Sequence, residues 1–128
     1  MKKVVKFGGS SLANAKQFKK VADIIKADKS RRYVVPSAPG KRNDKDEKVT
    51  DMLYACYDAV TEGRSYKKIL DKIKERYNEI IDGLDLNLNL DHEFDKIEEN
   101  FLAQAGRDYA ASRGEYLNGI IMSRYMDF

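Results

Sequence analysis

The sequence has little of what disulfide-bonded, zinc-binding and membrane proteins rely on. It contains one cysteine, Cys56, and one histidine, His92. A single cysteine excludes a disulfide within the chain, and these two residues are too few for a usual zinc site. No apolar stretch approaches the roughly 20 residues that cross a membrane, and the beginning lacks the apolar core of a signal peptide. We therefore expect a cytoplasmic protein with no metal site.

A large excess of one charge sign is also lacking. The 128 residues include 24 Lys and Arg against 21 Asp and Glu, a net charge of +3, with both signs mixed along the chain. Nucleic-acid-binding domains gather basic residues into a patch or an arm, so we expect neither a nucleic-acid nor a membrane partner. This length predicts one modest domain with a hydrophobic core.

Two short apolar segments with a helix between them form the start of the chain. Lys3 to Phe7 and Arg32 to Ser37 are rich in β-branched and aromatic residues, which favours strands. Between them, Asn14 is a good helix N-cap, and apolar side chains from Phe18 to Ile25 fall on one helical stripe. A strand–helix–strand unit with short joints predicts two parallel strands.

Helices are predicted for most of the remainder. Ala38 to Lys48 is polar and broken by proline and glycine, which predicts a mobile loop. Gly83 to Leu90 alternates leucine with Asp or Asn, and we interpret it as a loop whose leucines turn inward. The expected helices run from about Thr50 to Val60, from a cap at Ser65 to about Ile80, from Asp91 to about Ala105, and from a cap at Ser112 to about Tyr125.

Two strands are too few for the parallel sheet that they predict. Parallel sheets are covered by helices on both faces and average five or six strands. Either the two strands form a small sheet at the edge of a helical domain, or the chain is the N-terminal part of a larger α/β protein. We favour the second interpretation.

The first strand leads into two glycines and two serines, in the stretch VVKFGGSSLAN from Val4 to Asn14. Glycines at the end of a strand let the backbone approach a ligand closely, and successive N–H groups there can bind an anion. Lys6 adds a full positive charge, so the stretch suits a phosphate group. It matches neither the Walker A nor the GxGxxG pattern. A tight turn beside a surface lysine is the alternative.

The same stretch resembles the beginning of the aspartokinases, members of the amino acid kinase family, where K-F-G-G-[ST]-S opens the chain. YVVPSAPGK resembles the exit of the family's second strand, KVTDMLY its T-[DN]-x-L segment, and ASRGEYLNGIIMSRYM its S-x-G-E helix. These matches occur in the family's order and cover almost the whole chain. The resemblance implies a three-layer αβα fold with a mainly parallel sheet, of which this chain is a truncated, helix-rich N-terminal part.

The resemblance also implies a reaction and its ligands. Aspartokinases transfer the γ-phosphoryl group of ATP to the side-chain carboxylate of L-aspartate, giving 4-phospho-L-aspartate on the route to lysine, threonine and methionine. ATP, Mg²⁺ and L-aspartate are therefore the expected ligands, and the full-length protein is expected to be a homo-oligomer. The rest of the kinase domain and the ACT regulatory domains are absent from residues 1–128, so we expect these residues alone to be inactive.

Eight residues match functional positions of the family. Lys6 matches the lysine that contacts the transferring phosphoryl group, and Ser37 matches a serine near the reacting groups. Thr50 and Glu115 match aspartate-binding positions. The phosphate-binding residues implied by the resemblance are Lys6, Phe7, Gly8, Gly9 and Ser10.

Some of these residues also have structural interpretations. Ser112 and Glu115 are spaced as a capping box, in which the glutamate bonds back to the helix start. Thr50 could be the N-cap of its helix. The acidic residues Asp44, Asp46 and Glu47 alternate with lysines and are interpreted as solvated loop charges rather than metal ligands.

Two alternative functions stay open. Another member of the amino acid kinase family, acting on glutamate, carbamate or a nucleoside monophosphate, would share the lysine and the glycines. A non-catalytic helical interaction module would use the glycine turn only as a structural element.

Overall fold

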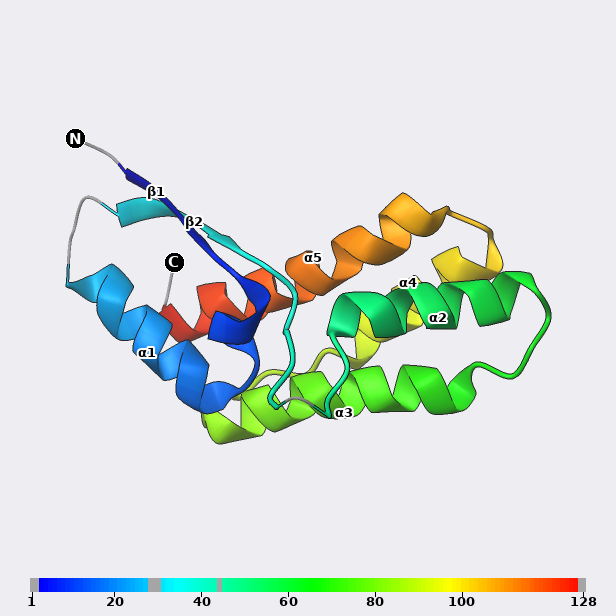
Figure 1. Cartoon of the computed structure of the whole chain (residues 1–128), viewed down its shortest axis with the longest axis horizontal. Coiled ribbons are helices and arrows are strands. Elements are labelled where there is room, and N and C mark those ends of the chain that lie inside the picture. Colours follow the sequence, from blue (N-terminus) through cyan, green and yellow to red (C-terminus); the bar gives the residue numbers. More distant parts are fainter. Residues whose placement is uncertain (1–2, 28–30, 44, 127–128) are drawn as a thin grey trace.

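The computed structural model describes residues 3–27, 31–43 and 45–126, and in this part of the chain two strands alternate with helices before a run of four helices (Figure 1). The elements are β1 (Lys3–Phe7), the 3-10 helix η1 (Gly9–Leu12), α1 (Ala15–Lys26), β2 (Arg31–Pro36), α2 (Val49–Thr61), α3 (Lys67–Gly83), α4 (Asp91–Leu102) and α5 (Arg107–Met126). The predicted helix-rich α/β arrangement is confirmed.

The two strands pair in parallel, as the strand–helix–strand pattern predicts. Val5 lies opposite Val34, and Phe7 lies opposite Pro36. The N–H of Ser37 donates to the carbonyl of Phe7 at 3.2 Å, so pairing continues one residue beyond β2. Both strands therefore end at the same edge, and the segments that leave them are neighbours.

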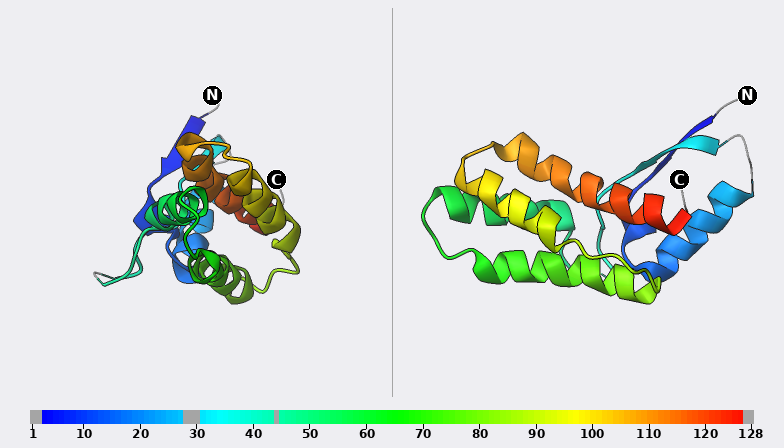
Figure 2. Two further views of the ribbon diagram at one scale, coloured as in Figure 1. Left: turned by 90° about the vertical axis from the view of Figure 1, so that its right-hand side faces the viewer. Right: turned by 180° about the vertical axis from the view of Figure 1, so that it is seen from behind.

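The four helices α2 to α5 pack side by side as a bundle, with the strands and α1 at one end (Figures 1 and 2). In both figures α1 and the C-terminal half of α5 lie on the same side of the strand pair. Within the described residues no helix covers the other side. No described helix is both long enough and apolar enough to cross a membrane.

One continuous hydrophobic core joins the sheet end to the bundle. Phe18 of α1, Tyr77 of α3 and Phe94 and Phe101 of α4 are almost fully buried. The leucines between α3 and α4 turn inward as predicted, since Leu84 and Leu90 are buried, and Leu86 and Leu88 are partly buried against the core.

The helix starts were predicted with mixed success. Asn14 caps α1 as expected, because its side-chain oxygen accepts from the N–H of Gln17 at 3.0 Å. Ser65 is not a cap, since α3 begins at Lys67 after Tyr66.

The predicted start of α5 at Ser112 is also wrong, because the helix already begins at Arg107. The chain reverses just before it, where Gln104 and Gly106 both have positive φ, 59° and 108°. The N–H of Gly106 donates to the hydroxyl of Tyr57 at 2.8 Å, which holds this turn against α2.

Candidate active site

A cavity of about 520 Å³ lies where the two strands end. Ligands of parallel α/β sheets bind beyond the carboxyl ends of the strands, because loops from neighbouring strands meet there. Four segments contribute to this cavity: the turn after β1, the loop after β2, the start of α2 and the middle of α5. Its lining residues are Gly9, Ser10, Ser37, Ala38, Pro39, Gly40, Lys41, Lys48, Thr50 and Glu115.

Five of the eight predicted site residues line this one cavity. They come from positions up to 106 residues apart in the sequence, and the fold brings them together. They are Gly9, Ser10, Ser37, Thr50 and Glu115.

The other three predicted residues, Lys6, Phe7 and Gly8, directly precede Gly9 in the chain but are not among the lining residues of the cavity. Phe7 is partly buried against the core, whereas Lys6 is exposed. Because consecutive strand residues point to opposite faces, the Lys6 side chain lies on the face of the sheet that no described helix covers. A phosphate-binding role for these three residues stays a prediction.

The turn after β1 and the loop after β2 touch backbone to backbone. The N–H of Gly40 donates to the carbonyl of Gly9 at 2.8 Å. A Cβ at Gly40 would lie 2.6 Å from the carbonyl carbon of Gly9 and 2.7 Å from the nitrogen of Ser10, so only glycine fits. After β1 the chain forms the 3-10 helix η1 before α1 begins. The amides of Gly9 and Ser10 therefore belong to a short 3-10 turn.

Ser37 is fixed to the bundle by a side chain that the sequence analysis did not single out. Asn118 of α5 is fully buried, and its side-chain N–H donates to the carbonyl of Ser37 at 2.7 Å. Its Oδ1 atom is buried and has no hydrogen-bond partner in the part of the chain that the structure describes. The bond holds the exit of β2 against α5 at the position where Ser37 enters the cavity.

The capping-box interpretation of Glu115 is wrong. Ser112 lies inside α5, where its hydroxyl donates to the carbonyl of Tyr109 at 2.7 Å, as a serine in a helix interior can. Glu115 is exposed and lines the cavity. Its carboxylate is therefore available to a ligand.

Thr50 is not the N-cap of its helix either. Lys48 occupies that position, and Val49 is the first residue of α2. The N–H of Val49 donates to the carbonyl of Pro39 at 3.0 Å, which ties the start of α2 to the loop after β2. Thr50 follows in the first turn, half-buried at the cavity wall.

Two lysines that the sequence analysis did not single out also line the cavity. Lys41 and Lys48 are exposed and lie on the loop between β2 and α2. Together with Glu115 of α5, they give the cavity wall two positively charged side chains and one negatively charged side chain. The alternation of lysine with acidic residues from Lys41 to Lys48 concealed this, because it resembles an ordinary solvated loop.

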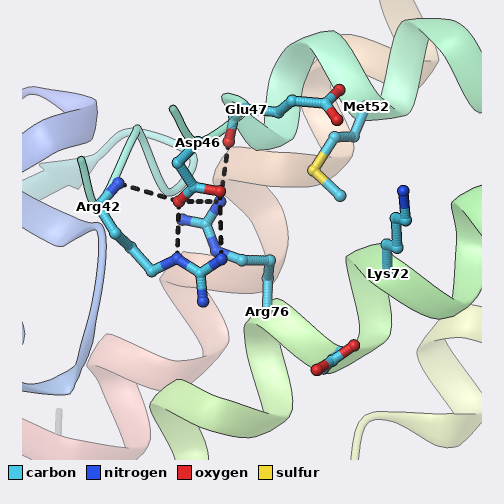
Figure 3. A pocket seen from close by; sticks show the side chains of 7 residues that line it. Arg42, Asp46, Glu47, Met52, Lys72 and Arg76 are labelled. Atoms are coloured by element: carbon cyan, nitrogen blue, oxygen red, sulfur yellow. Dashed lines mark hydrogen bonds and ion pairs between the residues drawn. The ribbon is translucent and has the colours of Figure 1, made fainter. Parts of the chain in front are cut away.

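The loop between β2 and α2 is more fixed than predicted. Ala38, Pro39 and Gly40 are buried. Asp46 is half-buried, not simply solvated, and accepts hydrogen bonds from the Nε of Arg42 at 2.6 Å and from its backbone N–H at 3.0 Å (Figure 3). The bond from the Arg42 side chain holds the pKa of Asp46 well below its usual range. Asp44 lies outside the described residues.

Two buried polar side chains, Arg76 of α3 and Asn118 of α5, bind backbone carbonyls of the cavity wall without lining the cavity themselves. Both fall on helix faces that are otherwise apolar: Arg76 lies between Ile73 and Ile80, and Asn118 between Leu117 and Ile121. A polar residue at a buried position of a helical stripe needs a partner, and that is the signal by which the sequence could have revealed them.

Comparison with known proteins identifies the family. The profile of the amino acid kinase family matches residues 1–127. The chain belongs to the amino acid kinase family.

Three relatives of this family member are aspartate kinases. It is 48% identical to the aspartate kinase of Clostridium acetobutylicum, with a TM-score of 0.92 over 97% of this chain and 29% of that one. It is 44% identical over 88 residues to aspartokinase 3 of Bacillus subtilis, which covers 69% of this chain and 19% of the relative. E. coli aspartokinase III, solved with aspartate and ADP, shares the fold at 24% identity and a TM-score of 0.74, over 97% of this chain and 28% of that one.

These matches confirm the resemblance and the fold class. The amino acid kinase fold is present here as a helix-rich α/β portion that spans less than a third of each relative.

Proposed function

We propose that this chain forms the aspartate-binding side and the first phosphate-contacting turn of an aspartate kinase. The reaction would transfer the γ-phosphoryl group of ATP to the side-chain carboxylate of L-aspartate and give 4-phospho-L-aspartate, the first step toward lysine, threonine and methionine. One observation carries the proposal: Gly9, Ser10, Ser37, Thr50 and Glu115 line a single cavity at the strand ends.

The charges around the cavity suit an amino acid with two carboxylates. Glu115 offers a carboxylate to the ammonium group of L-aspartate. Lys41, Lys48 and the hydroxyl of Thr50 offer positive charge and a hydrogen-bond donor to its carboxylates. An amino acid with one ammonium group and two carboxylates can pair with both the anion and the cations of this set, whereas a purely anionic ligand would leave Glu115 without a partner.

In this proposal the turn after β1 contacts the phosphate groups of ATP. Transfer needs the side-chain carboxylate oxygen to bond to the γ-phosphorus while the bond to the β–γ bridging oxygen breaks and ADP leaves. Two anions must approach each other, so positioning and neutralisation of charge carry the catalysis. We assign the neutralising charge to Lys6, and the N–H contacts to the stretch from Phe7 to Ser10.

The described residues fit ATP better than they fit a metal ion of their own. A Cβ at Gly9 would lie 3.2 Å from the carbonyl oxygen of Ala38 and from the Cα of Gly40, so a side chain there would press on the loop after β2. Among the described residues no three His, Cys, Asp or Glu side chains gather into a metal site. Mg²⁺ would therefore enter with the nucleotide and offset phosphate charge. The free thiol of Cys56 suits the reducing cytoplasm, the compartment that we propose.

The proposal is tested by titrating L-aspartate into the 128-residue chain and following backbone amide signals by NMR. We expect the signals of Ser37, Thr50 and Glu115 to move together, and Glu115→Gln to weaken binding by about tenfold, because a charge-assisted hydrogen bond is lost. Glu93→Gln, in α4 and outside this cavity, is the matched control.

The titration also separates the alternative functions. L-Glutamate, carbamate and a nucleoside monophosphate are added in place of L-aspartate, and a preference for any of them would replace the proposed substrate. A chain that responds to none of these ligands nor to inorganic phosphate would be an interaction module. A hydroxamate assay of the same chain should show no turnover above a Lys6→Ala variant, because the chain covers less than a third of the relatives.

A further inference from the structure

Arg76 joins three separate segments that surround the cavity. Its side chain is only 4% exposed and lies on the buried face of α3. One guanidinium nitrogen, Nη2, donates to the carbonyl of Gly40 at 2.6 Å and to that of Ala13 at 3.2 Å. The other, Nη1, donates to the carbonyl of Glu47 at 2.9 Å.

Each of these carbonyls belongs to a segment that leads to the cavity wall. Ala13 follows η1 and thus the turn that contains Gly9 and Ser10. Gly40 itself lines the cavity. Glu47 directly precedes Lys48 and the start of α2. A single side chain therefore contacts, from the side of α3, the three segments that leave β1, leave β2 and enter α2.

Gly40 connects Arg76 to the turn that contains Gly9. The carbonyl of Gly40 accepts from Arg76, and its N–H donates to the carbonyl of Gly9 at 2.8 Å. Since Gly40 and Gly9 touch without intervening side chains, a shift of one moves the other. A displaced guanidinium would therefore shift the backbone of Gly40 and Gly9, which faces the cavity.

An ion pair with Asp46 also holds the guanidinium of Arg76 in place. Asp46 lies 3.4 Å from its Nη1 atom. Arg42 also donates to Asp46, from its Nε atom at 2.6 Å (Figure 3). The Nη1 atom of Arg42 donates to Glu79 at 2.7 Å. A buried guanidinium costs free energy unless it is paired and hydrogen-bonded, and this arrangement supplies both an ion pair and three carbonyls.

We propose that Arg76 is a positioning residue of the active site, acting through Gly40 on the phosphate-contacting turn and through Glu47 on the start of α2. The ligand of that site rests on the function proposed above, whereas the effect on the backbone does not. Arg76 does not line the cavity at the strand ends. Its role is to fix the relative positions of three backbone carbonyls in two loops, at Ala13, Gly40 and Glu47, which a hydrophobic side chain of similar size could not do.

The test compares Arg76→Lys and Arg76→Met with Arg107→Met in the 128-residue chain. Lysine keeps the charge but not the planar fork that reaches three carbonyls. Arg107 pairs with Asp58 in the exposed part of the bundle and serves as the matched control. The first readout is hydrogen exchange of the Gly40 N–H, relative to amides in α4.

We expect both Arg76 variants to raise the exchange rate of the Gly40 N–H about tenfold beyond any change in α4, because loss of a charge-assisted bond has that effect. Arg107→Met should change neither. Equal acceleration at Gly40 and in α4 would mean that Arg76 only stabilises the fold, and would overturn the proposal. If Arg76→Met does not fold, Arg76→Lys decides.

Chemical rescue gives a second readout that general stability would not move. In Arg76→Ala, added ethylguanidinium should restore slow exchange at Gly40, whereas ethylammonium at the same concentration should not. Equal effects of the two cations would contradict the proposal. The dissociation constant for L-aspartate should rise about tenfold in Arg76→Lys. An unsubstituted chain that binds no L-aspartate would count against the proposed function, while the exchange experiment would still decide the role of Arg76.

Discussion

Asp46 shows how a single side chain can link pH to the shape of the site. The side-chain bond from Arg42 lowers its pKa, with smaller contributions from backbone N–H groups and the charge of Arg76. A carboxyl group whose pKa is lower in the folded state stabilises that state fully above its unfolded pKa, about 3.9. This stabilisation is lost as the pH falls through the lower, folded value.

The first prediction concerns Asp46→Asn. At neutral pH the variant should have a free energy of unfolding lower by about 1 kcal/mol, since the bond is charge-assisted but close to solvent. Below about pH 4 the difference should shrink, because the carboxyl group of Asp46 takes up a proton in the unfolded state while the folded state, with its lowered pKa, still holds it ionised. Urea unfolding at several pH values measures it. A difference that stays constant down to pH 2 would show that Asp46 is not the titrating group.

At this scale the sequence predicted the residues of the cavity better than the residues behind it. Gly9, Ser37 and Glu115 were found because their motifs resemble those of a known family. Arg76 and Asn118 were not, because their partners are main-chain carbonyls, and carbonyls carry no signature in the amino-acid sequence. Their only signal is a polar residue on an apolar helix face.

At the scale of elements, α5 presents one glycine to the site and another to open space. A Cβ at Gly114 would lie 2.5 Å from the Cβ of Ala38 and 3.3 Å from Leu53. The carbonyl of Gly114 accepts from the hydroxyl of Tyr77 at 2.9 Å. At Gly119 a Cβ would meet no atom of the described residues within 4 Å.

The second prediction compares alanine at these two positions of the same helix. Gly114→Ala should lower the free energy of unfolding by about 1–3 kcal/mol through overpacking, whereas Gly119→Ala should raise it by up to about 1 kcal/mol through helix propensity. Adding Ala38→Gly to Gly114→Ala should recover part of the loss, because it removes the contacting methyl group. Chemical denaturation measures all three, and equal effects of the two alanines would refute the packing argument.

Periodicity located the helices but not all of their ends. The apolar stripe of α3 and the cap at Asn14 are local signals, and the predictions from them were correct. The start of α5 depends on a turn at Gly106 that is held by the hydroxyl of Tyr57, 49 residues earlier. A long-range contact of this kind cannot be seen in a local pattern.

The whole molecule has one side of its strand pair without a helix in the described residues (Figure 2). Within residues 3–27, 31–43 and 45–126 each strand also has a partner on one edge only, since β1 and β2 form a two-stranded sheet. Unpaired strand edges can pair with another chain. The sequence predicted this imbalance correctly, because two buried-type strands cannot complete a parallel sheet.

The third prediction is that the 128-residue chain self-associates. Light scattering after size exclusion should show a mass that rises with protein concentration, because the strand edges and the bare face of the sheet become paired. A constant monomer mass with a cooperative thermal transition would contradict it.

The contact between Gly9 and Gly40 also limits which amino-acid substitutions this protein can accept during evolution. Most steric conflicts in a protein can be relieved by a smaller neighbour, but here the atoms in the way are themselves main chain. No second substitution can shrink a carbonyl carbon or an amide nitrogen. Position 40 should therefore yield no local suppressors in a genetic screen, and its loss should be reversible only by restoring the original codon's amino acid.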